Sequence, residues 1–345
     1  MARILLVNDS SLVRQLVTRL LADQPGIEGV ATASNGELAL RQLALMPFDL
    51  VLLDFEMPVM NGLETLAVLR REYPRLPVLM LSRYTVQGAE VTVEALMRGA
   101  ADYLTLPDEA AVDGLVRSRL QSDLLSKIQR LQAKPPANTR ALPPHMARPD
   151  AKMTVLAIGS STGGPRVLEQ ILCPLPRDFP VPVLIVQHIA VNFIQVLADS
   201  LGRKCSLPVR VAEHQHPVLA GEILLAPGAQ HLQVMRRDKQ LMVELDQGPQ
   251  ENSCRPSVDV LFRSLAEAYG SGVLALVLTG MGTDGLAGAR AIAAKGGQVL
   301  VQDQATSVVW GMPGVIAQAG LADGILTPDD LAREVLARAR KVTGS

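Results

Sequence analysis

Two glycine-rich segments that lie far apart in this sequence carry side chains that could do chemistry together. The first, Gly159-Ser160-Ser161-Thr162-Gly163, fits the pattern G-x-S-x-G, in which small residues allow a sharp strand-to-helix turn to expose one hydroxyl. The second, Thr279-Gly280-Met281-Gly282-Thr283-Asp284-Gly285, offers a carboxylate and backbone amides. Each segment follows an apolar run, so both can lie at the carboxyl edge of one parallel sheet. Together they supply groups that a serine hydrolase needs.

A serine hydroxyl is inert without a base, and His188 is the histidine best placed to serve. It follows the apolar run 182–186, whose strand is expected beside the serine strand because consecutive strands are usually neighbours. Asp284 can orient this histidine. The other histidines lie in a proline-rich segment or near turns: His145, His214, His216 and His231. Two plainer interpretations stay open, with His188 as a structural hydrogen-bonding group and Asp284 as the N-cap of the helix that follows it.

Composition and pattern argue against several other classes of protein. The P-loop lysine is missing, and Gln187-His188 stand where a dinucleotide site would need an acid. The net charge of -1, with both signs interspersed, does not indicate binding to nucleic acid. No apolar stretch approaches the length of a membrane span, and Asp9 comes too early for a signal peptide. Three widely separated cysteines predict reduced thiols in a cytoplasmic protein that does not insert into the membrane.

The first 121 residues alternate short apolar runs with amphipathic stretches, as α/β domains do. The predicted strands are 3–7, 29–33, 50–53, 78–81 and 102–105. Between the first two, a helical pattern places six residues on one face: Leu12, Val13, Leu16, Val17, Leu20 and Leu21. Five strands alternating with helices predict a doubly wound parallel sheet of the flavodoxin-like (βα)5 type.

A change of composition separates this domain, 1–121, from a second one, 153–345. Residues 122–152 begin with a short helical pattern and then become rich in proline, which predicts an exposed linker. In the second domain, strands are predicted at 153–158, 182–186, 209–212, 222–226, 232–235, 241–245, 273–278 and 298–301. We therefore expect a doubly wound, mostly parallel α/β domain in which 222–244 forms a β-hairpin insertion.

The first domain carries carboxylates where its first and third strands end. Asp9 and Asp54 should meet in the crevice at the carboxyl edge of the sheet, either as a magnesium site or by coincidence. The run 54–64 resembles the phosphoacceptor segment of response-regulator receiver domains. The resemblance implies that Asp54 accepts a phosphoryl group from a sensor histidine kinase of the chemotaxis type. It also implies that Asp9, Asp54 and the Glu56 carbonyl hold Mg²⁺.

Four further positions bear on this resemblance. Ser82 and Tyr103 stand where receiver domains have their hydroxyl and aromatic switch residues. Asn8, however, replaces the first acid of the usual pair, which removes one negative charge from the metal site. Leu106 replaces the lysine that contacts the phosphoryl oxygens, and leucine can neither donate a hydrogen bond nor offset charge. We therefore expect Asp54 to be phosphorylated poorly, or its phosphorylation to couple weakly to the second domain.

The second domain resembles the C-terminal domain of the chemotaxis-type protein-glutamate methylesterases. The order Ser161, His188, Asp284 differs from that of α/β-hydrolases, in which the acid precedes the histidine, and matches this family. The other matching segments are 157–165, 186–188, 226–228, 255–259, 278–285 and 305–313. The resemblance implies that Ser161 is the nucleophile, His188 the general base and acid, and Asp284 its orienter. It also implies that the Met281 amide, with an amide near Thr162, binds the oxyanion.

With a receiver domain in front, the resemblance covers nearly the whole chain. It implies hydrolysis of glutamyl methyl esters on methyl-accepting chemoreceptors, with release of methanol, and deamidation of receptor glutamines by the same machinery. It also implies that the receiver domain regulates access to the catalytic face. We expect a monomer that uses no cofactor for catalysis, with Mg²⁺ confined to the receiver domain.

Two other functions fit the same domains less well. A non-catalytic adaptor of receptor arrays would have no need of a complete set of serine, histidine and aspartate. A response regulator with a DNA-binding output would need a basic recognition helix, and the parallel-strand pattern of the second domain does not provide one.

Smaller features near the predicted site carry less weight. Arg255-Pro256-Ser257 is expected either to help form the substrate groove or to serve as capping and surface residues before a helix. Cys254 is expected to be a buried or neutral thiol rather than a second nucleophile, and His231 to be structural. If its surroundings are neutral, His188 should protonate near pH ~6.5, and activity should fall there.

Overall fold

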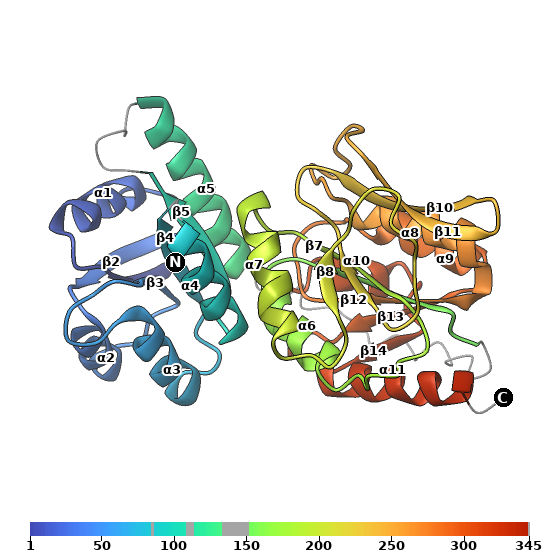
Figure 1. Cartoon of the computed structure of the whole chain (residues 1–345). Helices are drawn as coiled ribbons and strands as arrows, with labels where there is room; N and C mark the ends of the chain where they lie inside the picture. The colour runs from blue at the N-terminus through green and yellow to red at the C-terminus, as the bar shows by residue number, and fades with distance from the viewer. Residues whose placement is uncertain (84–85, 108–113, 133–151, 344–345) are drawn as a thin grey trace. The chain divides into compact units, whose positions relative to one another are not determined.

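The computed structural model describes residues 1–83, 86–107, 114–132 and 152–343 (Figure 1). The chain divides into two compact units, Met1–Lys134 and Pro135–Ser345. Most of the segment predicted to be a linker, including His145, lies outside the described residues.

The first unit is a five-stranded parallel sheet in the order β2-β1-β3-β4-β5. Its strands are β1 Ala2–Val7, β2 Ile27–Ala33, β3 Leu50–Asp54, β4 Val78–Arg83 and β5 Asp102–Leu106. Its helices are α1 Ser11–Leu21, α2 Gly36–Leu45, α3 Gly62–Glu72, α4 Val86–Met97 and α5 Gly114–Gln132. The strand order reverses direction between β1 and β3, where doubly wound sheets bind their ligands. The predicted flavodoxin-like fold is confirmed.

Helix α1 buries less of its predicted apolar face than the sequence suggests. Leu12, in its first turn, is 63% exposed. The residues that enter the core lie in the second half of the helix: Val17, Leu20 and Leu21. Leu12 therefore belongs to the apolar face of the helix but not to the core, because periodicity does not show where a helix leaves the sheet.

Helix α5 extends beyond residue 121, where the first domain was expected to end. It continues as one helix to Gln132, and its residues Leu124 and Ile128 pack in the core of the first unit. The short helical pattern seen after residue 121 is thus the second half of α5.

The second unit is built on a seven-stranded sheet in the order β14-β13-β12-β6-β7-β9-β8, in which every pairing is parallel. Its strands are β6 Val155–Ser160, β7 Val183–Gln187, β8 Val209–Val211, β9 Ile223–Leu225, β12 Val273–Val277, β13 Gln298–Gln302 and β14 Gly324–Leu326. Its helices are α6 Gly164–Leu172, α7 Val191–Gly202, α8 Val258–Tyr269, α9 Leu286–Ala294, α10 Met312–Gln318 and α11 Pro328–Thr343, with a 3-10 turn, η2, at Gly270–Gly272. The predicted α/β architecture is confirmed.

A separate antiparallel hairpin consists of β10, His231–Arg237, and β11, Gln240–Asp246. The hairpin insertion was predicted to include 222–226, and this part of the prediction is wrong. Strand β9 is fully buried and pairs in parallel with β7 in the main sheet, so the chain leaves the sheet only after it. Strand β14 was not predicted, because three residues that begin with glycine carry little strand signal.

The strands that lead to the predicted catalytic loops are buried along their whole length. Every residue of β6, β7 and β12 is buried, as expected of parallel strands with both faces covered. Helix α8 packs against α9 and the hairpin strand β10 (Figure 1), and also against β6. The loops that follow these strands therefore rest on a rigid support.

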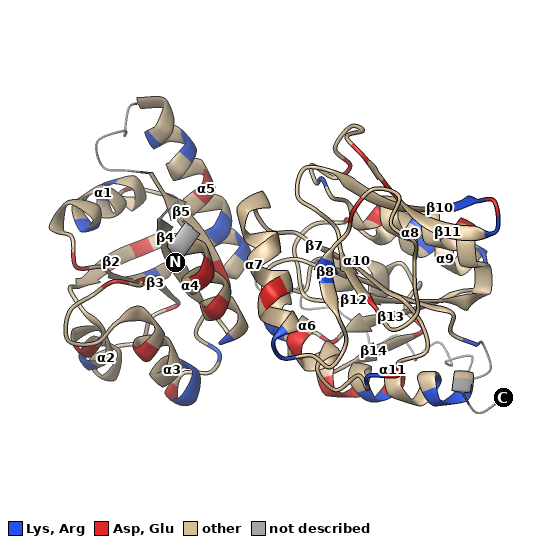
Figure 2. Ribbon diagram, viewed as in Figure 1, with Lys and Arg blue, Asp and Glu red and all other residues tan. Residues whose placement is uncertain are grey.

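Charged side chains of both signs are mixed over each unit (Figure 2). Helix α11, for example, has two acids in its first turn and two basic residues in its last. Within the described ranges, no helix is both long and apolar enough to cross a membrane.

Candidate active site

The sheet brings the three predicted catalytic loops to one edge. Ser161 follows β6, His188 follows β7, and the loop that contains Asp284 follows β12. Strand β6 pairs in parallel with β12 on one side and with β7 on the other. The carboxyl ends of the three strands are therefore adjacent, and the expected pairing of the serine and histidine strands is confirmed.

The turn after β6 presents Ser161 at the start of α6. The Ser161 N–H donates to the Thr279 carbonyl at 3.0 Å, which ties the serine loop to the β12 loop. Gly163 has a φ of 80°, in the left-handed region that glycine favours. A Cβ on Gly280 would lie 2.7 Å from the Ser161 Cβ, so the close approach of the two loops requires glycine there. The sharp turn predicted from the G-x-S-x-G pattern is present, and Ser161 is partly exposed.

Gln187, the last residue of β7, holds the serine turn from the other side. Its side-chain amide donates to the carbonyls of Ser161, at 2.9 Å, and of His188, at 3.0 Å. Its side-chain oxygen accepts a hydrogen bond from the Ser160 hydroxyl at 2.5 Å. No role in the site was predicted for Gln187, because no local pattern shows that an amide side chain at the end of a strand reaches the neighbouring loop.

His188 and Asp284 form the central hydrogen bond of the site. The Nε2 atom of His188 lies 2.9 Å from Oδ2 of Asp284. The side chain of Asp284 is buried, and burial alone would raise the pKa of its carboxyl. Hydrogen bonds from His188, Ser257 and Val258 outweigh burial and lower the pKa of Asp284 below its usual value. Asp284 is therefore an ionised partner for the imidazole.

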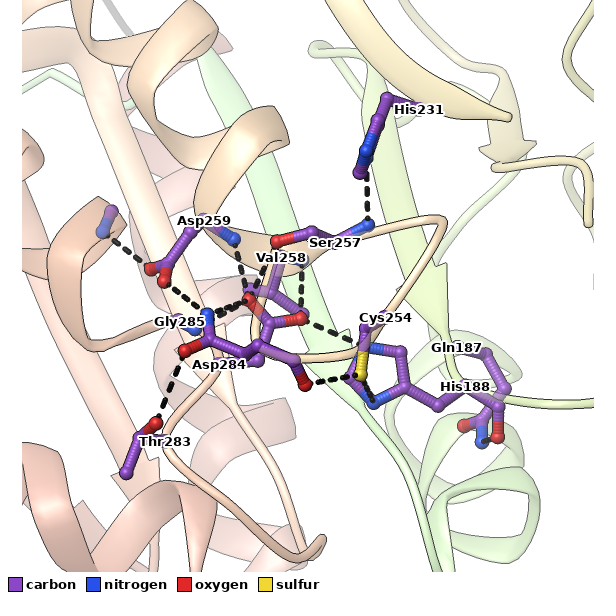
Figure 3. Close-up of polar contacts among 12 residues, drawn as sticks. Gln187, His188, His231, Cys254, Ser257, Val258, Asp259, Thr283, Asp284 and Gly285 are labelled. Carbon is purple, nitrogen blue, oxygen red and sulfur yellow. Dashed lines mark hydrogen bonds and ion pairs between the residues drawn. The ribbon is translucent and has the colours of Figure 1, made fainter. Parts of the chain in front are cut away.

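The Asp284 carboxylate is held at the N-terminus of α8 (Figure 3). Its Oδ1 accepts from the Ser257 hydroxyl at 2.7 Å and from the Asp259 N–H at 3.0 Å, while Oδ2 accepts from the Val258 N–H at 2.8 Å. Asp284 thus caps α8 rather than α9, the helix that follows it. Asp259 in turn accepts from the Gly288 N–H of α9 at 2.6 Å. Each of these two aspartates thus caps a helix to which it does not itself belong.

The second imidazole nitrogen of His188, Nδ1, lies 3.9 Å from the Cys254 Sγ (Figure 3). In the described part of the chain, no hydrogen bond joins the Ser161 hydroxyl to His188. Hydrogen bonds of catalytic groups are often long before substrate binds and tighten in the complex. The side chain in contact with Nδ1 is thus Cys254, to which the sequence analysis gave no role.

His188 was predicted to protonate near pH ~6.5 on the condition that its surroundings are neutral. The surroundings in the structure are not neutral. Burial lowers the pKa of the imidazole, but Asp284 and Cys254 more than offset it and raise the pKa of His188 to about 9. The carboxylate contributes both a hydrogen bond and an attraction between opposite charges. His188 therefore gives up its proton at a higher pH than a free histidine.

Met281, the predicted oxyanion donor, lies in the loop after β12. Among the residues that the structure describes, its N–H donates to no protein acceptor, whereas the Gly280 N–H donates to the Val309 carbonyl at 2.9 Å. Thr162 is buried, and its carbonyl accepts from the Thr279 hydroxyl at 3.0 Å. An oxyanion hole needs a donor that is not already engaged. The Met281 N–H meets this condition.

Two further predicted features have structural roles. His231 is buried, its Nδ1 accepts from the Ser257 N–H at 3.2 Å, and its Nε2 donates to the Pro249 carbonyl at 2.9 Å. Arg255 donates to two backbone carbonyls of the preceding loop, at 2.8 and 2.9 Å. Ser257 is fully buried at the N-cap position of α8, but its hydroxyl donates to Asp284 and makes no capping bond.

In the first unit, Asp9, Asp54 and Glu56 line one pocket of about 700 Å³. The Asn8 side-chain amide donates to Oδ2 of Asp54, and the Phe55 N–H donates to Oδ1 at 2.7 Å. Carboxylate and carbonyl oxygens are the ligands that Mg²⁺ prefers. The residues present therefore fit this ion, although Asn8 contributes no charge to the site.

The expected switch residues lie on β4 and β5. Ser82 is buried, and its hydroxyl shares a hydrogen bond with the Thr92 hydroxyl at 2.7 Å. The ammonium group of Lys127, on α5, lies 5.2 Å from the centre of the Tyr103 ring and 3.0 Å from the Asp102 carboxylate. Helix α5 is thus linked directly to the strand that carries the aromatic switch position.

Two of the three cysteines, which are widely separated in sequence, lie together in the second unit. The Sγ atoms of Cys173 and Cys205 are 3.2 Å apart, and both thiols are free. Burial and the hydrogen bond with Cys173 raise the pKa of the Cys205 thiol. The pair is separate from Cys254, which lies next to His188.

Comparisons with known proteins match both units. The family model described as CheB methylesterase matches residues 156–335, and the model described as response regulator receiver domain matches residues 4–112. A solved structure, the CheB methylesterase catalytic domain of Thermotoga maritima, is 38% identical with a TM-score of 0.53. It covers 53% of this chain and 97% of that domain.

Relatives extend this similarity over the whole chain. A protein-glutamate methylesterase/protein-glutamine glutaminase of Trichodesmium erythraeum is 44% identical, and the match covers 97% of this chain and 98% of that protein. A relative of the same description from Caulobacter vibrioides is 42% identical, with 99% of both chains covered. The family model and these relatives show that this chain belongs to the CheB methylesterase family.

Proposed function

We propose that this chain hydrolyses glutamyl methyl esters on methyl-accepting chemoreceptors and deamidates receptor glutamines at the same site. Relatives described by both activities match it over nearly their full length, which supports the proposal. The observation that carries the mechanism is the 2.9 Å hydrogen bond between His188 Nε2 and the Asp284 carboxylate. This pair lies at the sheet edge that also presents Ser161.

The first half of the reaction transfers the acyl group to Ser161. Asp284 holds the Nε2–H of His188, so Nδ1 is the nitrogen that accepts the proton of the Ser161 hydroxyl. The serine oxygen bonds to the ester carbonyl carbon, and the carbonyl electrons move to its oxygen, which the Met281 N–H stabilises. When this intermediate collapses, methanol leaves with the proton from His188, and the acyl group remains on Ser161.

The second half releases the product. A water molecule gives one proton to Nδ1 of His188 and adds its oxygen to the acyl carbon. Ser161 then leaves and takes the proton back, which frees a glutamate side chain. With a glutamine substrate, ammonia leaves in place of methanol, and the product is the same. The chemistry uses only side chains and backbone amides of the protein.

We further propose that the receiver domain regulates access to the catalytic face and responds weakly to a chemotaxis-type histidine kinase. Asp54 would accept the phosphoryl group. Asp9, Asp54 and the Glu56 carbonyl would hold Mg²⁺, which offsets phosphoryl charge when bound. The Asn8 amide donates to Oδ2 of Asp54, and Leu106, at the end of β5, provides no cation. Both features support a slow response.

Methanol release from methylated receptor membranes tests the nucleophile. Removal of the nucleophile of a catalytic triad costs up to ~10⁶ in rate, so Ser161→Ala should release no methanol above background. The matched control is Ser160→Ala, which removes only a hydrogen bond to Gln187 and should lower the rate by about tenfold at most. Comparable release by wild type and Ser161→Ala would contradict the proposal.

A further inference from the structure

Cys254 places a thiol against the histidine that we assign as the base. Its Sγ lies 3.9 Å from His188 Nδ1 and 3.4 Å from the Asn252 carbonyl (Figure 3). One ligand atom each of Cys254, His188 and Asp284 lies within 4.8 Å of the others. No step of the proposed reaction uses this thiol. A thiolate beside an imidazole is a typical ligand pair for borderline-soft divalent cations.

The hydrogen bonds of Asp284 determine which imidazole nitrogen could bind a cation. The carboxylate accepts from Nε2 of His188, so Nε2 carries the hydrogen and, in the neutral imidazole, Nδ1 has the lone pair. That lone pair is on the side of Cys254. Metal-binding histidines almost always donate their other N–H to a carboxylate, a carbonyl or water, which fixes the ring. His188 already has such a partner.

The separation of the two ligand atoms suits a tetrahedral ion. Bonds of about 2.0 Å to nitrogen and about 2.3 Å to sulfur, at a tetrahedral angle, place the two ligand atoms about 3.5 Å apart. The observed separation is 3.9 Å, and a small rotation of the Cys254 side chain closes the difference. Cys254 is partly exposed and its neighbours Asn252 and Ser253 are exposed, so an ion with its water ligands can reach the site.

We propose that His188 Nδ1 and Cys254 Sγ bind one Zn²⁺ ion, with Asp284 as the outer partner of the imidazole, and that the bound ion inhibits the esterase. The metal replaces the thiol proton and, where the imidazole is charged, the Nδ1 proton, and both pass to solvent. Inhibition follows because the lone pair that accepts the Ser161 proton is then bonded to the metal. This consequence rests on the proposed role of His188. Mg²⁺ does not compete, because it prefers oxygen ligands.

Isothermal titration calorimetry of Zn²⁺ with the full-length protein tests the site independently of activity. Cys254→Ser keeps the size of the side chain but removes the soft ligand, so it should lose one Zn²⁺ site or bind there at least about tenfold more weakly. The matched control is the double variant Cys173→Ser/Cys205→Ser, which removes the other neighbouring thiols and should keep the site. Equal stoichiometry and affinity in wild type and Cys254→Ser would overturn the proposal.

Methanol release, measured during the same Zn²⁺ titration, tests whether the bound ion inhibits the reaction. This result distinguishes the metal site from the proposed role of His188 as the base. Wild type and the double variant should lose at least about tenfold in rate at saturating Zn²⁺ and recover with EDTA, and Mg²⁺ should have no such effect. Cys254→Ser, compared with its own rate without Zn²⁺, should lose far less. If Zn²⁺ binds through Cys254 but release is unchanged, the metal site stands, while the inhibition and the proposed role of His188 fail.

Discussion

The Ser257 hydroxyl donates a hydrogen bond of 2.7 Å to Oδ1 of Asp284, and both side chains are almost completely buried. Ser257 is the N-cap residue of α8, yet its own side chain makes no capping bond. The carboxylate of Asp284 takes that role from another loop. One buried carboxylate thus connects the start of α8 to the imidazole of His188.

Ser257→Ala removes a buried hydrogen bond to a charged group. We expect it to lower the free energy of unfolding by about 1–3 kcal/mol. It should lower kcat by about tenfold with little change in KM, because Asp284 then orients His188 less firmly. Urea unfolding and methanol release measure the two effects. Ser257→Thr keeps the hydroxyl and should recover most of the rate, whereas a wild-type kcat in Ser257→Ala would exclude the positioning role.

The raised pKa of His188 predicts that the rate increases with pH. In the proposed mechanism His188 acts as a base in its neutral form. Burial lowers the pKa of His188, but Asp284 and Cys254 more than offset burial and raise this pKa to about 9. Release of methanol should therefore rise about tenfold per pH unit below this value and level off above it. A kcat/KM profile, corrected for spontaneous ester hydrolysis, measures this dependence. A plateau already reached by pH ~7 would contradict the prediction.

The same pKa predicts an opposite trend for stability. Because the pKa is higher in the folded protein than the usual value of 6.5, protonation of His188 favours folding. This contribution is fully present below pH ~6.5 and is lost as the pH rises through about 9. The test is to measure the free energy of unfolding of wild type and of His188→Gln across this pH range. The free energy of wild type should decline as the pH rises, and the variant should lack the part of this decline that His188 contributes.

Gly280→Ala tests the close approach of the two catalytic loops. The added Cβ would lie 2.7 Å from the Ser161 Cβ and 2.6 Å from the Met312 sulfur. A displacement of the nucleophile by about 1 Å can cost about 100-fold in rate, and we expect a loss of that order in kcat. Gly202→Ala, whose Cβ makes ordinary contacts at 3.8 Å, is the control and should leave kcat nearly unchanged. Equal kcat values in Gly280→Ala and Gly202→Ala would show that the close approach of Gly280 to Ser161 does not affect the rate.

Restoring the two altered receiver positions tests the weak response of Asp54. Leu106→Lys adds a cation at the end of β5, and Asn8→Asp adds a carboxylate beside Asp54. The double variant should be labelled by a small-molecule phosphodonor with Mg²⁺ at least about tenfold faster than wild type. Without Mg²⁺ it should be less stable, because two carboxylates then repel each other. Leu106→Met is the uncharged control, and labelling of wild type as fast as the double variant would contradict the expectation.

The placement of Ser161, His188 and Asp284 at one edge was predictable because each follows a continuous apolar run. Such runs are typical of parallel strands with both faces covered, and their ends share one edge of the sheet. The errors arose where this signal is weak. Strand β9 has only three residues and was grouped with the hairpin that follows it, and β14 is too short to show a pattern.

The sequence by itself determined two α/β domains, the turn that presents Ser161 and the strands before His188 and Asp284. Only the tertiary structure showed that Ser257 holds Asp284, that Gln187 supports the serine turn and that Cys254 lies against the base. A hydrogen bond acts over about 3 Å, so its partners depend on how packed segments align. His188 and Asp284 are 96 residues apart, and no local pattern encodes an alignment over that distance.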